Sequence, residues 1–348
     1  MSKDKTVPDA LSQTCRMNNS FAKMHQTLSE AQSVAITMHV RPDGDSLGSS
    51  AALRMMLLSM GKRVDVFFDG EVPNNLLYIE GVETFIPAGT DFDDSTIYDV
   101  LIVLDTNEAA RIGAWQTLLD RAKRVIVFDH HLNPTLDAYL LITNPLRASV
   151  GEMMFEYMTD QKVEITTPMA EALYTAVSSD TGCFLFPNTT SYTHHVASEL
   201  MKTNINVATI NYSNFREYDP KQISALMEVL RQIKFLAAGK IAVTYLNYKM
   251  VKKYKFDHET RHRFQRYATD AQGVRVSIFL TEMERDVFNI SLRSHGNVNV
   301  AEIAATFGGG GHKNAAGVTM EGRYKNVIKK LVERVELELR RCSTVGEE

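Results

Sequence analysis

Short apolar runs alternate with stretches of helical periodicity over roughly the first half of the chain. The third and fourth runs are apolar throughout, which is typical of parallel strands covered by helices on both faces. Strands are expected at residues 34–38, 64–68, 100–104, 125–128 and 139–142. Helices are expected at residues 47–60, 150–160, 168–177 and 192–201, and Asp45 or Ser46 can cap the first of them. This alternation predicts an α/β fold, with a parallel sheet and crossover helices in the N-terminal domain.

The pattern changes near residue 203, where the chain becomes rich in Asn and Tyr and loses its period. A helix at 221–236 follows, and then strands are expected at 241–246, 274–281 and 287–292. These elements predict a smaller α+β domain with a mixed or antiparallel sheet. The expected organisation is a domain at 20–203, a linker at 204–220 and a second domain at 221–340. We assign no role to residues 1–28.

Composition narrows the class of protein. Of 348 residues, 44% are hydrophobic and 23% are charged, as in a globular protein with a core. No stretch approaches the roughly 20 apolar residues of a membrane span, and the polar start does not resemble a signal peptide. Three separated cysteines (Cys15, Cys183 and Cys342) fit a reducing cytoplasm. The net charge of −4 argues against a long duplex as ligand but is compatible with a short nucleotide.

Histidine and aspartate residues, which can bind metal ions, follow the predicted strands. His39, Asp43 and Asp45 follow the first strand, and Asp105 follows the third. Asp129, His130 and His131 follow the fourth strand, and Asp180 follows a predicted helix. Because ligands of an open α/β sheet bind at the carboxyl ends of its strands, we expect these side chains to converge there.

Converging carboxylates repel one another unless cations lie between them. Imidazole and carboxylate together suit Mn²⁺, with Mg²⁺, Fe²⁺ or Zn²⁺ less easily excluded. Each residue also has a simpler interpretation, because a lone Asp after a strand is often a helix cap or a turn residue. Two adjacent histidines directly after a buried strand are harder to explain in that way. The set as a whole therefore predicts a site for two divalent metal ions that acts on phosphoesters.

The motifs also resemble those of a known family. Residues 39–49 (HVRPDGDSLGS), 129–131 (DHH) and 180–182 (DTG) resemble the motifs of the DHH phosphoesterase family. Residues 309–317 (GGGHKNAAG) are similar to the signature of the DHH-associated C-terminal domain. The resemblance covers about residues 33–339, and the size is similar to that of the NrnA-like nanoRNase/pAp phosphatase group. It implies an active-site cleft between the two domains.

The resemblance implies a role for each residue at the strand ends. His39 and Asp43 would hold one metal ion, Asp45, His130 and Asp180 would hold the other, and Asp105 would bridge them. A hydroxide between the ions would be the nucleophile. His131 would contact the phosphate or orient the leaving group, and Asp129 would fix an imidazole by hydrogen bonding.

The second half of the chain offers a substrate-holding motif. Four glycines, 308–311, precede His312, and such a run lets backbone N–H groups converge on an anion. The alternative is a flexible turn, and Arg293 nearby favours the anion site because Arg holds phosphate bidentately. The resemblance implies that Arg293, Gly309, Gly310, Gly311 and His312 hold the terminal phosphate or base of a short nucleotide. A mixed basic and aromatic stretch, 261–267, is interpreted as a solvated helix face.

The expected function is hydrolysis of short oligoribonucleotides, one nucleotide at a time, with action on the 3′-phosphate of pAp (adenosine 3′,5′-bisphosphate). The nearest alternative is cleavage of cyclic-di-AMP or its linear product pApA. A haloacid-dehalogenase-like phosphatase is disfavoured, because it leaves His130 and His131 unexplained. A non-catalytic nucleotide-binding protein is disfavoured by the complete ligand set. No membrane partner is expected, and a homodimer is compatible with the sequence.

Overall fold

The computed structural model describes residues 10–93, 95–255 and 258–344, with the side chains of 10–16, 258–263 and 343–344 outside the description. The chain divides into two compact units, unit 1 ending at Glu217 and unit 2 beginning at Tyr218. We describe each unit by itself. None of the helices among the described residues is both long and apolar enough to cross a membrane.

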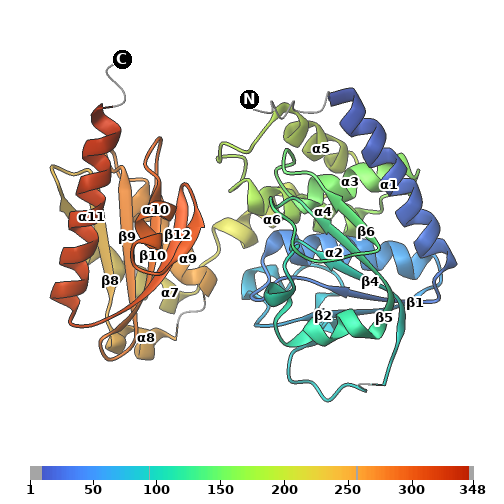
Figure 1. Ribbon diagram of the computed structural model, residues 1–348, viewed down its shortest axis with the longest axis horizontal. Helices are drawn as coiled ribbons and strands as arrows, with labels where there is room; N and C mark the ends of the chain where they lie inside the picture. The colour runs from blue at the N-terminus through green and yellow to red at the C-terminus, as the bar shows by residue number, and fades with distance from the viewer. Residues whose placement is uncertain (1–9, 94, 256–257, 345–348) are drawn as a thin grey trace, which may run out of the picture. The chain divides into compact units, whose positions relative to one another are not determined.

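Unit 1 is built on a parallel sheet, as predicted, with six strands where five were expected (Figure 1). The strands are β1 (Ser33–Thr37), β2 (Arg63–Phe68), β3 (Ile86–Pro87), β4 (Tyr98–Leu104), β5 (Ala122–Asp129) and β6 (Leu140–Thr143). Their order is β3-β2-β1-β4-β5-β6, and every neighbouring pair is parallel. The order reverses between β1 and β4, which is where a doubly wound sheet binds its ligands.

Helices cover both faces of this sheet. They are α1 (Ala10–Glu30), α2 (Gly44–Ser59), α3 (Val150–Asp160), α4 (Thr167–Asp180), α5 (Ser191–Met201), α6 (Val207–Phe215) and the short 3₁₀ segments η1 (Asn74–Leu76), η2 (Val82–Thr84) and η3 (Ala109–Arg121). Helices α1 to α5 share one large core with the sheet, and η3 closes a smaller core on the other face around Phe67 and Trp115. Helix α1 contributes Phe21, Met24 and Leu28, all fully buried. Residues 17–30 therefore have a packing role that the sequence did not reveal.

The cap of α2 differs from the expectation. Asp43, rather than Asp45 or Ser46, is the N-cap: its backbone is extended and its Oδ1 accepts hydrogen bonds from the N–H groups of Asp45 and Ser46, both at 3.1 Å. The Ser46 hydroxyl in turn accepts from the N–H of Asp43 at 3.0 Å, which completes a capping box. The helix begins at Gly44, so Asp45 lies inside its first turn, and its carboxylate does not cap this helix.

Unit 2 contains a mixed sheet, one of the two kinds expected, with six strands where three were predicted. Its strands are β7 (Lys234–Leu236), β8 (Ile241–Leu246), β9 (Val276–Glu284), β10 (Val287–Ser294), β11 (Gly310–His312) and β12 (Ala315–Glu321), in the order β11-β12-β10-β9-β8-β7. Only the β8–β9 pair is parallel among the described strands of this sheet. The helices are α7 (Pro220–Arg231), α8 (Tyr248–Tyr254), α9 (His258–Thr269), α10 (Val300–Ala305) and α11 (Tyr324–Thr344). Helices α10 and α11 pack on one face, and α7, α8 and α9 contribute to a second core (Figure 1).

The predicted helix at 221–236 is too long. Helix α7 ends at Arg231, and residues 234–236 form strand β7, which pairs antiparallel with β8. The two strands are joined by a tight turn in which Ala237, Ala238 and Gly239 all have positive φ. A helical pattern and an edge strand are hard to distinguish over three residues, and pairing with β8 decided between them here.

Candidate metal centre

The predicted ligands gather at the carboxyl edge of the unit 1 sheet. His39 lies just beyond β1 and Asp105 directly follows β4, so these two flank the point where the strand order reverses. His39, Asp45, Asp105 and Asp129 are buried, with exposed fractions of 7%, 0%, 3% and 0%. Within the described residues, three groups of side chains have ligand atoms that all lie within 4.8 Å of one another. Every predicted ligand belongs to at least one of these groups.

The first group consists of His39, Asp43 and Asp105. The Nε2 atom of His39 lies 3.6 Å from Oδ2 of Asp43 and 3.3 Å from Oδ2 of Asp105. Because Oδ1 of Asp43 caps α2, the helix cap itself turns Oδ2 toward His39. One residue thus begins the helix and faces the cluster.

The second group consists of Asp45, His130 and Asp180. The Nε2 atom of His130 lies 3.4 Å from Oδ2 of Asp180 and 4.0 Å from Oδ2 of Asp45. The same Nε2 is 3.5 Å from Oδ1 of Asp105, whereas Oδ2 of Asp105 faces His39. Asp105 therefore directs one carboxylate oxygen toward each group, which is the arrangement a bridging ligand needs.

Asp45 is held by the beginning of a second helix. Its Oδ2 accepts from the N–H of Val150 at 2.7 Å and its Oδ1 from the N–H of Gly151 at 2.8 Å. These are the first two residues of α3, whose N–H groups have no partners within the helix. The contact explains how a fully buried carboxylate is tolerated, and it connects α2 to α3 directly at the cluster.

The third group consists of Asp105, His130 and His131. The Nδ1 atom of His131 is 2.8 Å from Oδ1 of Asp129 and 3.6 Å from Oδ1 of Asp105. Asp129 is thus the hydrogen-bonding partner of His131. This group makes His131 an alternative metal ligand, so its contact with the substrate phosphate stays a prediction.

Backbone carbonyls orient the other two imidazoles. Nδ1 of His39 lies 2.9 Å from the carbonyl oxygen of Val40, and Nδ1 of His130 lies 3.2 Å from that of Arg147. A carbonyl can only accept, so both rings carry their proton on Nδ1 and direct Nε2 toward the carboxylates. This is the second contact that metal-binding histidines ordinarily make.

The histidines and carboxylates of the cluster shift one another's pKa values. Burial lowers the pKa of His39, but Asp43 and Asp105 outweigh it and raise that pKa to about 11. Burial likewise lowers the pKa of His130, and Asp105, Asp180 and Asp45 raise it to about 11. Burial raises the pKa of Asp45, and so do the neighbouring carboxylates, Asp105 first among them. Burial also raises the pKa of Asp180, and there Asp43 is first among the neighbouring carboxylates. The raised pKa values of the two histidines show that the cluster favours positive charge beside its carboxylates.

Unsatisfied polar atoms support a metal site. In the described part of the chain, Oδ1 of Asp105 and Nε2 of His130 are buried and have no hydrogen-bond partner. Leaving such atoms unpaired is costly, and both face the cluster. Imidazole nitrogen and carboxylate oxygen are the donor set that Mn²⁺, Zn²⁺ and Fe²⁺ accept. The residues fit a centre for divalent cations.

Two of the predicted substrate-holding residues of unit 2, Arg293 and His312, lie in one row of its sheet. Arg293 on β10 is opposite Ala315 on β12, and Ala315 is opposite His312 on β11. Residues directly opposite one another in an antiparallel sheet point to the same face, so Arg293 and His312 flank the small Ala315. Arg293 is largely buried, which lowers the pKa of its guanidinium, and its Nη1 donates to the carbonyl of Leu292 at 3.1 Å.

The glycine run is not a flexible turn. Residues 310–312 form strand β11, paired with β12. A Cβ at Gly309 would collide with the carbonyl oxygen of Gly317, and one at Gly311 would lie 2.5 Å from that of Ala315. Close backbone packing therefore requires glycine at these two positions. At Gly310 the space is open.

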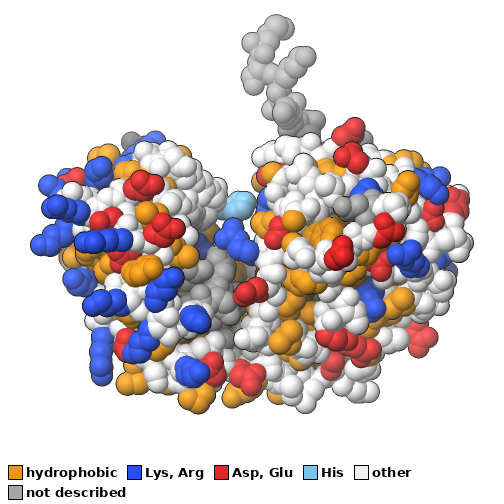
Figure 2. Space-filling view, turned by 90° about the horizontal axis from the view of Figure 1, so that it is seen from below, with side chains coloured by type: hydrophobic (Ala, Val, Ile, Leu, Met, Phe, Trp, Pro, Cys, Tyr) orange, Lys and Arg blue, Asp and Glu red, His pale blue; other side chains and the backbone are white. Residues whose placement is uncertain are grey.

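The two units carry opposite charge. Residues 218–348 contain 22 of the 38 Lys and Arg residues but only 15 of the 42 Asp and Glu residues. Figure 2 shows Lys and Arg side chains spread over the face of unit 2 that it presents. A basic surface attracts phosphate groups, whereas the acidic balance of unit 1 favours cations.

Comparison with known proteins identifies the family. A model of the DHH family, N-terminal domain, matches residues 33–177, and a model of the DHHA1 domain matches residues 239–341. The chain belongs to the DHH family. With both domains and the His/Asp cluster present, it is a DHH-family phosphoesterase.

Several relatives of this DHH protein match it over most of their length. A Thermus thermophilus protein named bifunctional oligoribonuclease and PAP phosphatase NrnA is 29% identical, with 89% of this chain and 91% of the relative covered. A Mycoplasma pneumoniae protein of the same name is 26% identical, with 89% and 94% covered. An exopolyphosphatase-related protein from Bacteroides fragilis has a solved structure that matches with a TM-score of 0.86 at 27% identity, covering 91% and 96%.

Sequence reasoning missed the loop that supports His130 in this DHH protein. Arg147, whose carbonyl orients His130, donates from Nε and Nη2 to Oε2 of Glu156 at 3.0 and 2.8 Å. Its guanidinium also lies 3.7 Å from the centre of the Tyr192 ring. Only the Asn144-Pro145 turn marks this loop in the sequence, and nothing in that turn points to the carbonyl of residue 147.

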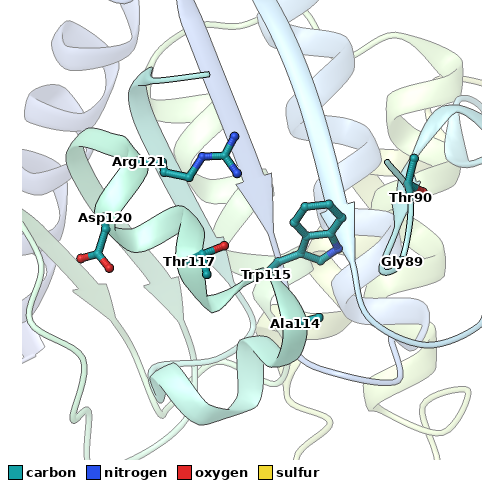
Figure 3. Close-up of a pocket in the computed structure, with 7 residues that line it drawn as sticks. All are labelled: Gly89, Thr90, Ala114, Trp115, Thr117, Asp120 and Arg121. Carbon is teal, nitrogen blue, oxygen red and sulfur yellow. The ribbon is translucent and has the colours of Figure 1, made fainter. Parts of the chain in front are cut away.

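Two other features carry no site. A pocket of about 490 Å³ beside η3 is lined by Gly89, Thr90, Ala114, Trp115, Thr117, Asp120 and Arg121 (Figure 3). Two of its lining side chains have internal partners: Trp115 donates to the carbonyl of Phe68, and Arg121 donates to those of Thr96 and Asp93. In the stretch 261–267, the side chains of 261–263 lie outside the described residues. Phe264 is fully buried, so that part of α9 faces the core rather than solvent.

Proposed function

We propose that this DHH phosphoesterase hydrolyses short oligoribonucleotides from an end and also removes the 3′-phosphate of pAp, using two divalent cations. The observation that carries the proposal is the shared carboxylate, because Asp105 presents one oxygen to each of two three-residue groups. The substrate class comes from relatives at 26–29% identity whose names give both activities.

Each cation would have its own ligands. His39, Asp43 and Asp105 would hold one, and Asp45, His130, Asp180 and Asp105 would hold the other. Mn²⁺ is the expected ion, with Mg²⁺ an alternative, because imidazoles and carboxylates are mixed. When bound, such a pair neutralises phosphoryl oxygens and supplies a water nucleophile at neutral pH.

His131 would act on the substrate itself. Asp129, buried at the end of β5, receives Nδ1–H of His131 and so holds the ring in one orientation. Nε2 is then the atom that would contact a phosphoryl oxygen or protonate the leaving group. Asp129 would be a positioning residue, acting through His131.

Unit 2 would hold the far end of the substrate. Arg293 and His312, in one row of the sheet, would grip a terminal phosphate or base, with open space at Gly310 and basic surroundings in support. Gly309, Gly310 and Gly311 would shape the backbone beside this end of the substrate, with the N–H of Gly309 held by the carbonyl of Ala304 at 2.9 Å. The cleft between domains and the domain boundaries at 20–203, 204–220 and 221–340 stay predictions.

Initial rates with Mn²⁺ test the proposal. A diribonucleotide, pAp, cyclic-di-AMP and inorganic polyphosphate should be compared side by side, and the first two are expected to be the best substrates. Separate Asp45→Asn, Asp105→Asn and Asp180→Asn changes should each lower kcat more than about a hundredfold, because even residues that merely support metal ligands contribute 10- to 100-fold. Asn preserves the shape of the Asp45 side chain and can still accept one of the two N–H groups that begin α3.

Asp137→Asn is the matched control, since Asp137 is an exposed aspartate of the same unit. It should keep the rate of the unmodified protein. Preference for polyphosphate over every nucleotide would refute the substrate assignment. Full activity in any two of the three ligand variants would refute the metal centre.

A further inference from the structure

Large apolar side chains are exposed beside the metal cluster. Among the described residues, the three most exposed large hydrophobic side chains are Leu185, Leu146 and Leu132, at 82%, 72% and 69%. Phe186, at 50%, lies next to the first of them. We call Leu132, Leu146, Leu185 and Phe186 the apolar rim. Exposed apolar groups that gather at one place usually mark a binding surface.

The apolar rim belongs to the loops that form the cluster. Leu132 directly follows His131, and Leu146 precedes Arg147, whose carbonyl orients His130. The side-chain amide of Asn188 donates to the carbonyls of Ala148 and Asp180, at 3.2 and 3.1 Å. This amide joins the loop after β6 to the loop after α4. The rim residues thus lie on the loops that also carry or support His130, His131 and Asp180.

The backbone that carries Phe186 is strained. Gly182, Cys183 and Phe184 have φ values of +56°, +60° and +64°, so three consecutive residues are left-handed. The turn is closed by the N–H groups of Leu185 and Phe186, which both donate to the carbonyl of Thr181 at 2.9 Å. Non-glycine residues in this conformation cost free energy and persist where surrounding contacts hold them. The strained turn fixes where Leu185 and Phe186 lie relative to Thr181.

One face of the Phe186 ring lies on Gly182. Three ring atoms are 2.5 to 2.7 Å from the place that a Cβ at Gly182 would occupy, so the ring packs directly on this glycine. Gly182 is two residues beyond Asp180, which fixes the ring close to the cluster. Since the residue is half exposed, the ring has backbone on one side and surface open to a ligand.

We propose that Phe186 is a stacking platform for a base of the substrate, flanked by the leucines of the apolar rim. The inference rests on the proposed function, because a base lies one ribose away from the phosphate at the cluster. Stacking on an aromatic ring is open to every base, so this platform would accept short oligonucleotides without regard to sequence. A substrate of phosphate alone would gain nothing from it.

The test compares substrates with and without bases. Phe186→Ala, Phe186→Leu and Phe186→Trp should be assayed with Mn²⁺ on a diribonucleotide and on the same backbone carrying 1-deoxyribose abasic residues. Loss of the ring should raise KM for the diribonucleotide about tenfold in the Ala and Leu variants. The Trp variant should stay near the unmodified protein. KM for the abasic compound and Mn²⁺ affinity by calorimetry should change less than about twofold in all three.

Phe235→Ala is the matched control, because Phe235 is a Phe of similar exposure, 54%, on strand β7 of unit 2. It should leave both KM values unchanged. The platform is refuted if Phe186→Leu behaves like the unmodified protein, or if both substrates are affected alike. If the unmodified protein does not cleave the diribonucleotide at all, the proposed function fails rather than the platform.

Discussion

Single carboxylates at the metal centre also hold the ends of neighbouring helices. Asp43 caps α2 with one oxygen and faces His39 with the other, and Asp45 receives the first N–H groups of α3. The residue types and their places after strands were enough to predict which side chains would meet. The predicted N-cap of α2 was wrong because Asp43, Asp45 and Ser46 are all good capping residues, and only the backbone geometry distinguishes them.

The two adjacent histidines should differ in their effect on metal binding. His130→Asn is expected to weaken Mn²⁺ binding more than tenfold, since Nε2 of His130 faces Asp45, Asp105 and Asp180. His131→Asn should leave the affinity within about threefold and lower kcat by about 10²- to 10⁴-fold, as expected for a proton-transfer group. Asn keeps a donor near Nδ1 in both variants, and calorimetry measures the affinity.

The opposite result, in which His131 itself binds the metal, also has a structural basis, because Asp105, His130 and His131 form the third ligand group. Equal loss of Mn²⁺ affinity in both variants would make His131 a ligand and would leave the protein without the proposed phosphate contact.

Long, strongly patterned elements were predictable, and short ones were not. The parallel sheet of unit 1 agrees with the expectation because β4 and β5 contain the apolar runs 100–104 and 125–128, which are well separated. Strands β3, β7 and β11 have two or three residues each, too few for a period to show. They exist because a neighbouring strand offers hydrogen bonds. Likewise η3 replaces a crossover helix with 3₁₀ segments broken at Gly113, where φ is +69°.

One side chain connects the beginnings of three strands. Asp99 on β4 accepts from the N–H groups of Gln32 and Ser33, before and at the start of β1, and from Lys123 on β5. Lys123 first, and then these N–H groups, hold the pKa of Asp99 well below its ordinary value. A lowered pKa stabilises the fold above the pKa of the unfolded chain, near 4, and the stabilisation is lost as pH falls further.

Asp99→Asn should therefore lower the free energy of unfolding at pH 7 by about 1 kcal/mol, a modest value because the site is partly exposed. The difference should shrink between pH 4 and pH 3, where the carboxylate of the unmodified protein begins to lose its advantage. Urea denaturation at several pH values measures it, with Asp137→Asn as the control. A difference that stays constant across this range would contradict the assigned ion pair.

At the scale of the molecule, topology explains why a site scattered along the chain could be expected. Right-handed crossovers place the ends of β1, β4 and β5 at one edge, so His39, Asp105 and His130 meet there. The apolar rim could not be foreseen, because exposed leucines in loops have no periodicity. Nor could the row of Arg293 and His312, which depends on the register of three strands in unit 2.

In the proposed metal centre, side chains between His39 and Asp180 build one cage for two cations around Asp105. Crystals of the protein grown with Mn²⁺ should be measured at the manganese absorption edge, where anomalous scattering locates the metal directly. Two peaks are expected, one on each side of the Asp105 carboxylate, at roughly 3.5–4 Å from each other. A single peak, or peaks away from His39 and His130, would contradict a two-cation centre that shares Asp105.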